Sequence, residues 1–388
     1  MSAKRKSLTR TAFKVILVIF VVALVIAGTL IATFAVTKRT DIKQSKLPAY
    51  GEESISAKPQ NSLTQKEQVN VLSIDGGALL GLAELEVLIA LEKITGRQTY
   101  ELFDVVAGSS TGAIISSLLF LPTEKTGKPM TAEQAREEFV RLSSSVFEHS
   151  RIRKLITLNG LIAPRFSSAG RIEASKDLFK DATFSELLRP TIFPALLQNN
   201  DDPHLFRNWK DSDQSLMVAS LVPAVTSAEG LFPAIELIGY GETSSLVNDP
   251  VLVLNSPGHV AYLEARDLYP EAKKFVIVTV TTHFRNVVGA DLQRHGGELS
   301  WIRPAIAISR QSQKYISQMA LDAHARFESE VKIENFLLSP DIDGVGSDAF
   351  ISTPETVQMI DEAGLKFIEN HQKLLDQVAK ALIASNAP

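Results

Sequence analysis

The feature that most constrains this chain is the stretch FDVVAGSSTGAIISSLLF at residues 103–120. An apolar run typical of a buried strand ends in a Gly-Ser-Ser-Thr-Gly turn, and an apolar run of helical length follows it. So few residues between the two runs require a tight strand-to-helix junction. We therefore predict a strand over 102–108 and a helix over 112–121.

The same order of elements precedes this stretch. The segment QVNVLSI at 68–74 predicts a buried strand, DGGALLG at 75–81 a glycine-rich turn, and LAELEVLIALEKITG at 82–96 a helix. Two successive strand–turn–helix units predict a parallel sheet that is covered by helices, which is the α/β class.

The remainder of the chain adds elements of the same kinds. We predict further strands at 252–255 and 274–280 and helices at 312–335 and 354–386, and we find no internal repeat. The simplest organisation is one α/β/α domain over residues 68–388, in which a parallel sheet lies between layers of helices.

The N-terminal segment differs in composition from this domain. Residues 15–36 form an uncharged run of 22 residues, VILVIFVVALVIAGTLIATFAV. As a helix the run is about 33 Å long, which is enough to span the hydrocarbon core of a bilayer. We predict a transmembrane helix, preceded by a basic tail at 1–14 and followed by a polar stalk at 37–67. The stalk should hold the domain near the bilayer without packing against the helix.

A cleaved signal peptide is the alternative for this run. The run is longer than a usual signal core, and no clean Ala-x-Ala site follows it. Its orientation is nearly balanced, because five Lys and Arg residues precede the run and four follow it. The small excess on the N-terminal side favours a cytoplasmic N-terminus, with the domain outside the cytoplasm.

Composition and charge exclude several classes of function. The chain has no cysteine, which excludes disulfides, thiolate metal sites and a cysteine nucleophile. Residues 47–388 hold 31 Lys and Arg against 43 Asp and Glu without a basic stripe, so we expect no nucleic-acid partner. No two histidines show metal-ligand spacing, and we predict neither a metal site nor a cofactor.

The Gly-Ser-Ser-Thr-Gly turn has the spacing of a nucleophile elbow, Gly-x-Ser-x-Gly. Gly108 and Gly112 leave room for a sharp turn, and Ser110 is exposed on its crest between Ser109 and Thr111. The N-terminus of the following helix favours a developing negative charge there. We predict that Ser110 is a nucleophile, and the alternative is a Gly/Ser turn that only caps the helix.

The earlier glycine-rich turn is a candidate oxyanion hole. Gly76, Gly77 and Ala78 lie between a buried strand and a helix, so their backbone N–H groups can form an anion-binding nest. A dinucleotide or phosphate loop is the alternative, but Gly-x-Gly-x-x-Gly and the Lys-Ser/Thr pair of a P-loop are absent. Asp75 at the strand end is expected to be structural.

With SIDGGALLGL followed by FDVVAGSSTGAIISSLL, the chain resembles the patatin-like phospholipases. That family combines an Asp-Gly-Gly-Gly-x-Arg-Gly loop with a Gly-x-Ser-x-Gly elbow, and its general base is an Asp ahead of an Asn-Asn-Pro-like turn. Here Asn255-Ser256-Pro257 stands at that turn, which makes Asp249 the corresponding Asp. AVTSAEGLFPA (224–234) and FSELLRPTIFPALL (184–197) are also similar, so the resemblance covers roughly residues 68–285.

The resemblance implies a lipid acyl hydrolase of phospholipase A or lysophospholipase type with a Ser110–Asp249 dyad. It also implies phospholipid or lysophospholipid as substrate and the membrane bilayer as a partner. Three residues depart from the family pattern: Ala78 stands for the third glycine of the loop, Leu80 for its Arg, and Pro250 follows Asp249.

Two other functions remain open at this point. A catalytically impaired, membrane-anchored lipid-binding or scaffold protein would suit the departures at Leu80 and Pro250. A Ser-His-Asp esterase would need a histidine base, and His283, just after the predicted strand at 274–280, is the best placed by chain order.

Overall fold

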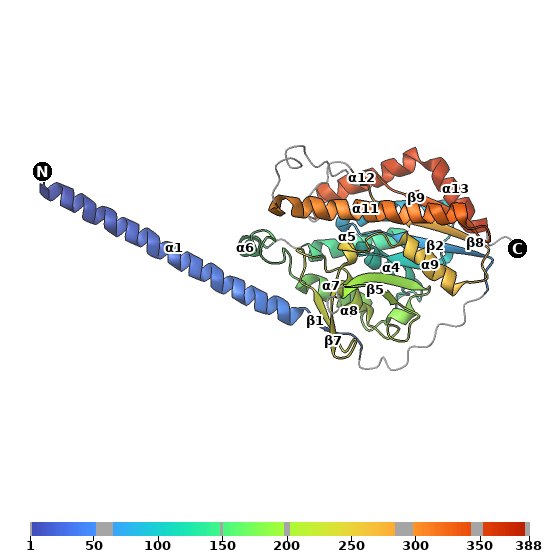
Figure 1. The fold of residues 1–388 in the computed structure, drawn as a ribbon, viewed down its shortest axis with the longest axis horizontal. Helices are drawn as coiled ribbons and strands as arrows, with labels where there is room; N and C mark the ends of the chain where they lie inside the picture. The colour runs from blue at the N-terminus through green and yellow to red at the C-terminus, as the bar shows by residue number, and fades with distance from the viewer. Residues whose placement is uncertain are drawn as a thin grey trace.

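The computed structural model describes residues 2–51, 65–147, 150–197, 202–283, 298–342 and 352–384. These residues form a nine-stranded sheet with helices on both faces, and one long N-terminal helix extends away from this body (Figure 1). The strands in chain order are β1 (Lys46–Pro48), β2 (Gln68–Ile74), β3 (Val105–Gly108), β4 (Thr191–Leu197), β5 (Asp202–Arg207), β6 (Ile235–Ile238), β7 (Ser244–Asn248), β8 (Lys274–Val280) and β9 (Lys332–Leu338).

The helices of the described residues vary widely in length. They are α1 (Ser2–Gln44), α2 (Gly81–Thr95), α3 (Thr99–Leu102), α4 (Thr111–Phe120), α5 (Ala132–Val146), α6 (Arg151–Ile156), α7 (Ala169–Phe179), α8 (Val218–Val225), α9 (Gly258–Leu268), α11 (Glu298–Phe327), α12 (Pro354–Asn370) and α13 (Gln372–Ile383). Short 3-10 turns are η2 (Ala78–Leu80), η3 (Phe184–Glu186) and η4 (Pro250–Leu252).

The sheet has a parallel part and an antiparallel part. Strands β4, β3, β2, β8 and β9 lie side by side in that order and run parallel. Beyond β4 the order is β7, β6 and β1, with antiparallel pairing of β4 with β7 and of β7 with β6, while β5 pairs antiparallel with β4. The predicted α/β class is confirmed, in the form of a mixed sheet that is mainly parallel.

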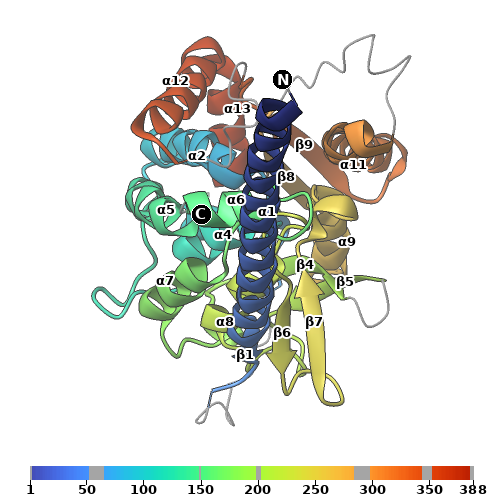
Figure 2. The same cartoon turned by 90° about the vertical axis from the view of Figure 1, so that its left-hand side faces the viewer.

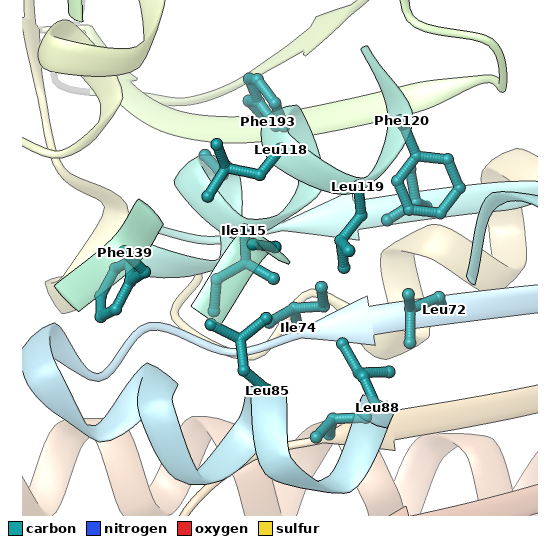
Figure 3. Packing of buried hydrophobic residues seen from close by; sticks show 14 of the residues in the cluster. Leu72, Ile74, Leu85, Leu88, Ile115, Leu118, Leu119, Phe120, Phe139 and Phe193 are labelled. Atoms are coloured by element: carbon teal, nitrogen blue, oxygen red, sulfur yellow. The ribbon is translucent and has the colours of Figure 1, made fainter. Parts of the chain in front are cut away.

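Two layers of helices bury the two faces of the sheet (Figure 2). On one face Leu72 and Ile74 of β2 pack against Leu85 and Leu88 of α2 and against Ile115 of α4 (Figure 3). All five side chains are fully buried, and each such burial stabilises the fold by about 1.5–3 kcal/mol. On the other face β2 and β8 pack against α9 and α11. The loops after the parallel strands β2, β3 and β8 therefore emerge at one edge, between the two layers.

The strands over 68–74 and 274–280 and the helices over 82–96 and 112–121 are found as predicted, to within one residue at their ends. The predicted strand at 252–255 is wrong, because Pro250 begins a 3-10 turn there and the strand of this region is β7. The predicted helix at 312–335 is too long at its C-terminus, since α11 ends at Phe327 and β9 pairs with β8 along its whole length.

The N-terminal helix α1 runs without a break from Ser2 to Gln44. In the described part of the chain it is the one helix long and apolar enough to cross a membrane, over Phe13–Gln44, and its apolar window is not buried against the body. A membrane anchor and a signal sequence both have this character.

The predicted polar stalk at 37–67 does not match the structure where the structure describes it. Helix α1 continues to Gln44, and β1 then pairs in parallel with β6, so that buried Leu47 lies opposite Leu237. An ion pair between Asp41 and Arg153 also holds the end of α1 against the body. The predicted separation of helix and domain is therefore wrong, while residues 52–64 lie outside the described part.

Candidate active site

The turn between β3 and α4 has the strained geometry that an elbow requires. Ser110 has φ 51° and ψ −119°, outside the ordinary region for an L-residue, and it is the N-cap residue of α4. A Cβ at Gly108 would lie 2.3 Å from the carbonyl oxygen of Gly112, and one at Gly112 would lie 2.2 Å from that of Ile74. Both positions therefore need glycine. Buried Ser109 and Thr111 flank the crest.

The structure brings Ser110 and Asp249 together across 139 residues of sequence. The Ser110 hydroxyl donates to Oδ2 of Asp249, with the two oxygens 2.5 Å apart, and Asp249 Oδ1 accepts the Val251 N–H at 2.9 Å. Asp249 is fully buried, and this burial raises its pKa to about 6 against the opposing effect of the Ser110 hydrogen bond. A carboxyl group in this environment is poised near neutral pH.

Pro250 fits the local backbone beside Asp249. Asp249 is the N-cap of the short turn η4, and Pro250 occupies its first position. A proline is tolerated there because the first N–H of a helix has no intrahelical partner. The family departure at Pro250 therefore leaves the orientation of Asp249 toward Ser110 intact.

The loop after β2 lies directly against this pair. A Cβ at Gly76 would lie 2.8 Å from the Ser110 Cβ, and Ala78 has φ 53°. The Gly76 N–H donates to the carbonyl oxygen of Asn255 at 3.3 Å, so it is already engaged. Among the described residues nothing accepts the N–H groups of Gly77 and Ala78, which line the same cavity. The structure thus narrows the candidate oxyanion donors from three amides to these two.

Arg310 on α11 reaches the same loop, and nothing in the sequence predicted it. Its Nη2 donates to the Gly76 carbonyl oxygen at 2.5 Å, and it lines the cavity together with Ser110 and Asp249. Burial lowers the pKa of Arg310, while the carboxyl groups of Glu84, Asp75 and Asp249 oppose that shift. Leu80 stands at the position where the family has an Arg, and its side chain is buried in the cavity wall. Arg310 therefore brings a cation to this loop from another part of the chain.

A second arginine that influences Asp249 is Arg171 on α7, and its side chain is buried. Arg171 donates to the Pro223 carbonyl oxygen at 2.8 Å and to Ser227 Oγ at 2.7 Å. The carbonyl oxygen of Ser227 in turn accepts the Asp249 N–H at 3.2 Å. Burial lowers the pKa of Arg171 to about 9, and Asp249 opposes this shift. A cation on a helix ordinarily lies on a solvated face, so this residue carried no sequence signal.

Asp75 makes contacts that suit the structural role expected of it. Its buried carboxylate accepts a hydrogen bond from Ser256 Oγ at 3.0 Å, and its N–H donates to the Val280 carbonyl oxygen at 3.1 Å. Burial raises its pKa to about 6, and hydrogen bonds from Thr281 and Ser256 oppose this. Asp75 thus ties the loop after β2 to the end of β8.

The pair lies in a cavity of about 550 Å³ with mainly apolar walls. Its apolar lining comes chiefly from α5, α7, the segment after α8 and α11, and includes Phe139, Leu142, Val146, Phe147, Leu178, Phe179, Val222, Leu231, Phe232 and Ile306. A cavity of this size and polarity suits an extended hydrocarbon group beside a few polar groups. None of the histidines in the described part of the chain lines this cavity. His283 instead lies beyond β8, where its backbone forms an isolated parallel β-bridge with that of Asp341.

Part of the chain is similar in sequence to a known family. The sequence model of a family described as patatin-like phospholipase matches residues 72–238, which include the elbow and most of the cavity wall. This segment of the chain is therefore similar to the patatin-like phospholipases. Asp249 lies beyond the matched segment, so its assignment depends on the 2.5 Å contact with Ser110.

Several larger proteins are similar in sequence to part of this chain. Calcium-independent phospholipase A2-gamma from Homo sapiens is 25% identical over 340 residues, which are 81% of this chain and 40% of that protein. Phospholipase A I from Arabidopsis thaliana is 36% identical over 162 residues, which are 41% of this chain and 11% of that protein. The chain thus spans less than half the length of these relatives. The solved structure of VipD from Legionella pneumophila covers 81% of this chain and 71% of its own, with 12% identity and a TM-score of 0.34.

Proposed function

We propose that the chain is a serine hydrolase that cleaves fatty-acyl esters of lipids, of phospholipase A or lysophospholipase type. The observation that carries this proposal is the contact of Ser110 Oγ with Asp249 Oδ2 at 2.5 Å, on a strained elbow inside an apolar cavity. The similarity to the patatin-like phospholipases and to phospholipase relatives supports the same reaction class.

In the proposed mechanism Ser110 Oγ attacks the ester carbonyl carbon while Asp249 accepts its proton. The N–H groups of Gly77 and Ala78, with the N-terminus of α4, stabilise the oxyanion of the tetrahedral intermediate. Collapse of that intermediate breaks the ester C–O bond, and Asp249 returns the proton to the leaving alcohol. Water then attacks the acyl-enzyme by the same route, which releases the fatty acid and restores Ser110.

Arg171 and Arg310 stabilise the charges that this reaction needs without taking part in bond formation. Arg310 fixes the loop that carries the two amides through its bond to the Gly76 carbonyl oxygen. Arg171 and Arg310 both favour the charged form of Asp249, which offsets part of the cost of its burial. The pKa of Asp249 is thus raised above its ordinary value but stays low enough for the carboxyl group to be ionised near neutral pH.

The apolar walls of the cavity suit an acyl chain, and α1 suits a membrane anchor. We assign residues 15–36 to the bilayer-spanning segment, residues 1–14 to a basic tail, and the chain from 68 to 388 to the catalytic domain. A bilayer anchor next to an acyl-binding cavity favours phospholipid or lysophospholipid over a water-soluble ester.

The direct test measures fatty-acid release from phospholipid vesicles by wild type, Ser110→Ala and Asp249→Asn. Each substitution should lower turnover at least about 10³-fold, because the dyad acts as one unit. The controls Ser144→Ala and Asp181→Asn make the same chemical changes at exposed positions and should retain activity. Equal release by wild type and both dyad variants would refute the dyad.

Labelling of Ser110 by a fluorophosphonate separates an enzyme from a scaffold with the same fold. An activated serine reacts with this probe, whereas a serine in a retired site does not. Wild type should label and Ser110→Ala should not. Absence of labelling and of release in wild type would favour the lipid-binding scaffold instead.

A further inference from the structure

A group of exposed apolar side chains lies outside the cavity, on α6 and the turn that follows it. Ile152, Leu155, Leu158, Leu161 and Ile162 are 68%, 62%, 55%, 62% and 54% exposed, and we call these five residues the α6 lobe. Single exposed apolar residues are ordinary on a protein surface. Five of them within one short segment form a patch, and such patches mark surfaces that bind a partner or a membrane.

The α6 lobe is built on a defined turn. Leu158 and Asn159 have φ values of 47° and 56°, so the chain reverses in the left-handed region directly after α6. Beneath the lobe Ile156 and Thr157 are buried, and Thr157 Oγ1 donates to the Arg153 carbonyl oxygen at 2.8 Å. The exposed side chains are therefore held outward by a segment that is itself fixed to the body.

An ion pair joins this segment to the end of α1. Arg153 donates from Nη1 and Nη2 to the two carboxylate oxygens of Asp41 at 3.0 and 2.7 Å, and both side chains are nearly buried. Asp41 follows Val36, the last residue of the apolar run, by about 8 Å along a helix. In both views α6 lies beside α1, on the side of the body from which α1 extends (Figures 1 and 2). The α6 lobe therefore lies at the level where the hydrocarbon of a bilayer around α1 would end.

The same segment forms part of the cavity rim. Asn159 and Gly160 line the cavity that holds Ser110, and the Arg165 N–H a few residues later donates to the Gly230 carbonyl oxygen at 3.1 Å. A lipid that leaves the bilayer beside the α6 lobe thus meets the cavity within the same loop.

The charges around the lobe suit a phospholipid surface. Arg151 and Lys154 are exposed on α6, and Lys38 and Arg39 are exposed on the neighbouring part of α1. Apolar side chains flanked by cations are typical of segments that lie in the headgroup region, where anionic lipids attract the cations.

We propose that the α6 lobe inserts into the bilayer that holds α1 and places the cavity rim against the lipid. The proposal rests on the proposed function, because it gives the route by which an acyl chain reaches Ser110. Docking of the α6 lobe would hold the cavity rim against the lipid, in addition to the contacts by which α1 and β1 hold the body.

The first test places a fluorophore in the lobe of the full chain, reconstituted in vesicles of phosphatidylcholine and phosphatidylglycerol. The chain has no cysteine, so Ile162→Cys gives a single labelling site, and Leu365→Cys on α12 is a control with the same exposure of 54%. Lipids brominated on their acyl chains should quench the label at position 162 and leave the label at position 365 unquenched. No quenching at 162, or disulfide-linked dimers of Ile162→Cys that show a second copy covering the lobe, would overturn the proposal.

The second test separates bilayer access from chemistry. The triple variant Leu155→Ser, Leu158→Ser, Leu161→Ser should release fatty acid from vesicles at least about tenfold more slowly, because three buried apolar contacts with lipid are lost. Its hydrolysis of a soluble short-chain ester should match wild type. The control triple variant Leu188→Ser, Leu263→Ser, Leu365→Ser changes exposed leucines elsewhere and should keep both activities.

The outcomes of the two tests distinguish the proposals. Equal vesicle hydrolysis by wild type and the α6 triple variant would overturn lobe docking and leave the dyad standing. Absence of both activities in wild type would overturn the proposed function, and the quenching measurement would then still decide where the lobe lies.

Discussion

The elbow and helix α11 supply groups to the same cavity, but the sequence encodes them differently. The elbow depends on residues within one turn, because a Cβ at Gly108 or Gly112 would collide with nearby backbone carbonyls. Arg310 of α11 contacts Gly76, which is 234 residues away in the sequence. It reaches that loop only because α11 packs against α9 and η4. A steric requirement inside a turn can be recognised in the sequence, whereas a charge delivered by tertiary packing cannot.

The largest effect in this comparison is expected at the elbow itself. Gly112→Ala should lower the free energy of unfolding by at least about 3 kcal/mol, because the added Cβ meets backbone that cannot move aside. Urea denaturation of the full chain in detergent measures this. Gly28→Ala is the control, since nothing lies within 4 Å of a Cβ at Gly28. An unchanged midpoint for Gly112→Ala would show that the turn tolerates a side chain.

The fold, too, could be predicted where it depends on local sequence and not where it depends on distant contacts. The strands over 68–74 and 274–280 are buried along almost their whole length because both faces of the central sheet are covered, and their content of Val, Ile, Leu and Phe makes them recognisable. The first four residues of β9 were included in the predicted helix at 312–335, because the strand is only partly buried and its pairing with β8 depends on distant sequence. β1 is too short to show any pattern, and burial of Leu47 becomes evident only in the assembled sheet.

The candidate site divides in the same way. Ser110 and the glycines belong to a local pattern, and Asp249 was assigned through the family resemblance and lies in contact with Ser110. The engagement of the Gly76 amide by Asn255 was not predictable, because it depends on how two distant loops meet. The same holds for Arg171 and Arg310, whose positive charges both favour the ionised form of Asp249. Sequence patterns thus identify the groups proposed to react, while packing determines their electrostatic surroundings.

The next largest effect is expected at Arg310. Arg310→Ala should lower kcat about 10²-fold, because the loop that carries the proposed oxyanion donors loses its contact at the Gly76 carbonyl oxygen. Arg310→Lys keeps the charge and should recover part of this loss. The double variant Leu80→Arg, Arg310→Ala restores a cation at the family position and should also exceed Arg310→Ala. The control Arg326→Ala removes an exposed cation from the same helix.

Kinetics with a soluble ester measure these variants without a contribution from the membrane. If Arg310→Ala and wild type have the same kcat, the loop keeps its geometry without the cation, and Arg310 acts only in packing. If Leu80→Arg gives no recovery in the Arg310→Ala background, the cation is needed at the Gly76 carbonyl oxygen specifically and not merely near the loop.

The smallest effect concerns pH and tests the charge of Arg310 separately from its contact. Asp249 must be ionised to act as a base, and burial raises its pKa to about 6. The kcat/KM of wild type should therefore be lost as pH falls through about 6, with a tenfold decrease for each further pH unit. This loss is the acid limb of the pH profile. Arg310 favours the ionised form of Asp249, so Arg310→Ala should move the acid limb to higher pH and Arg310→Lys should move it less.

Glu229 and Asp75 could imitate such a limb, because burial raises the pKa of Glu229 in the same cavity to about 7 and that of Asp75 in the adjoining loop to about 6. Glu229→Gln and Asp75→Asn each remove one of these titrations, and an acid limb that persists near 6 in both variants belongs to Asp249. A limb that vanishes with Glu229→Gln would assign the titration to Glu229. A limb that stays unshifted in Arg310→Ala would mean that Arg310 influences the site through the loop alone. The elbow and α11 would then differ only in how they are encoded, and both would act by fixing backbone.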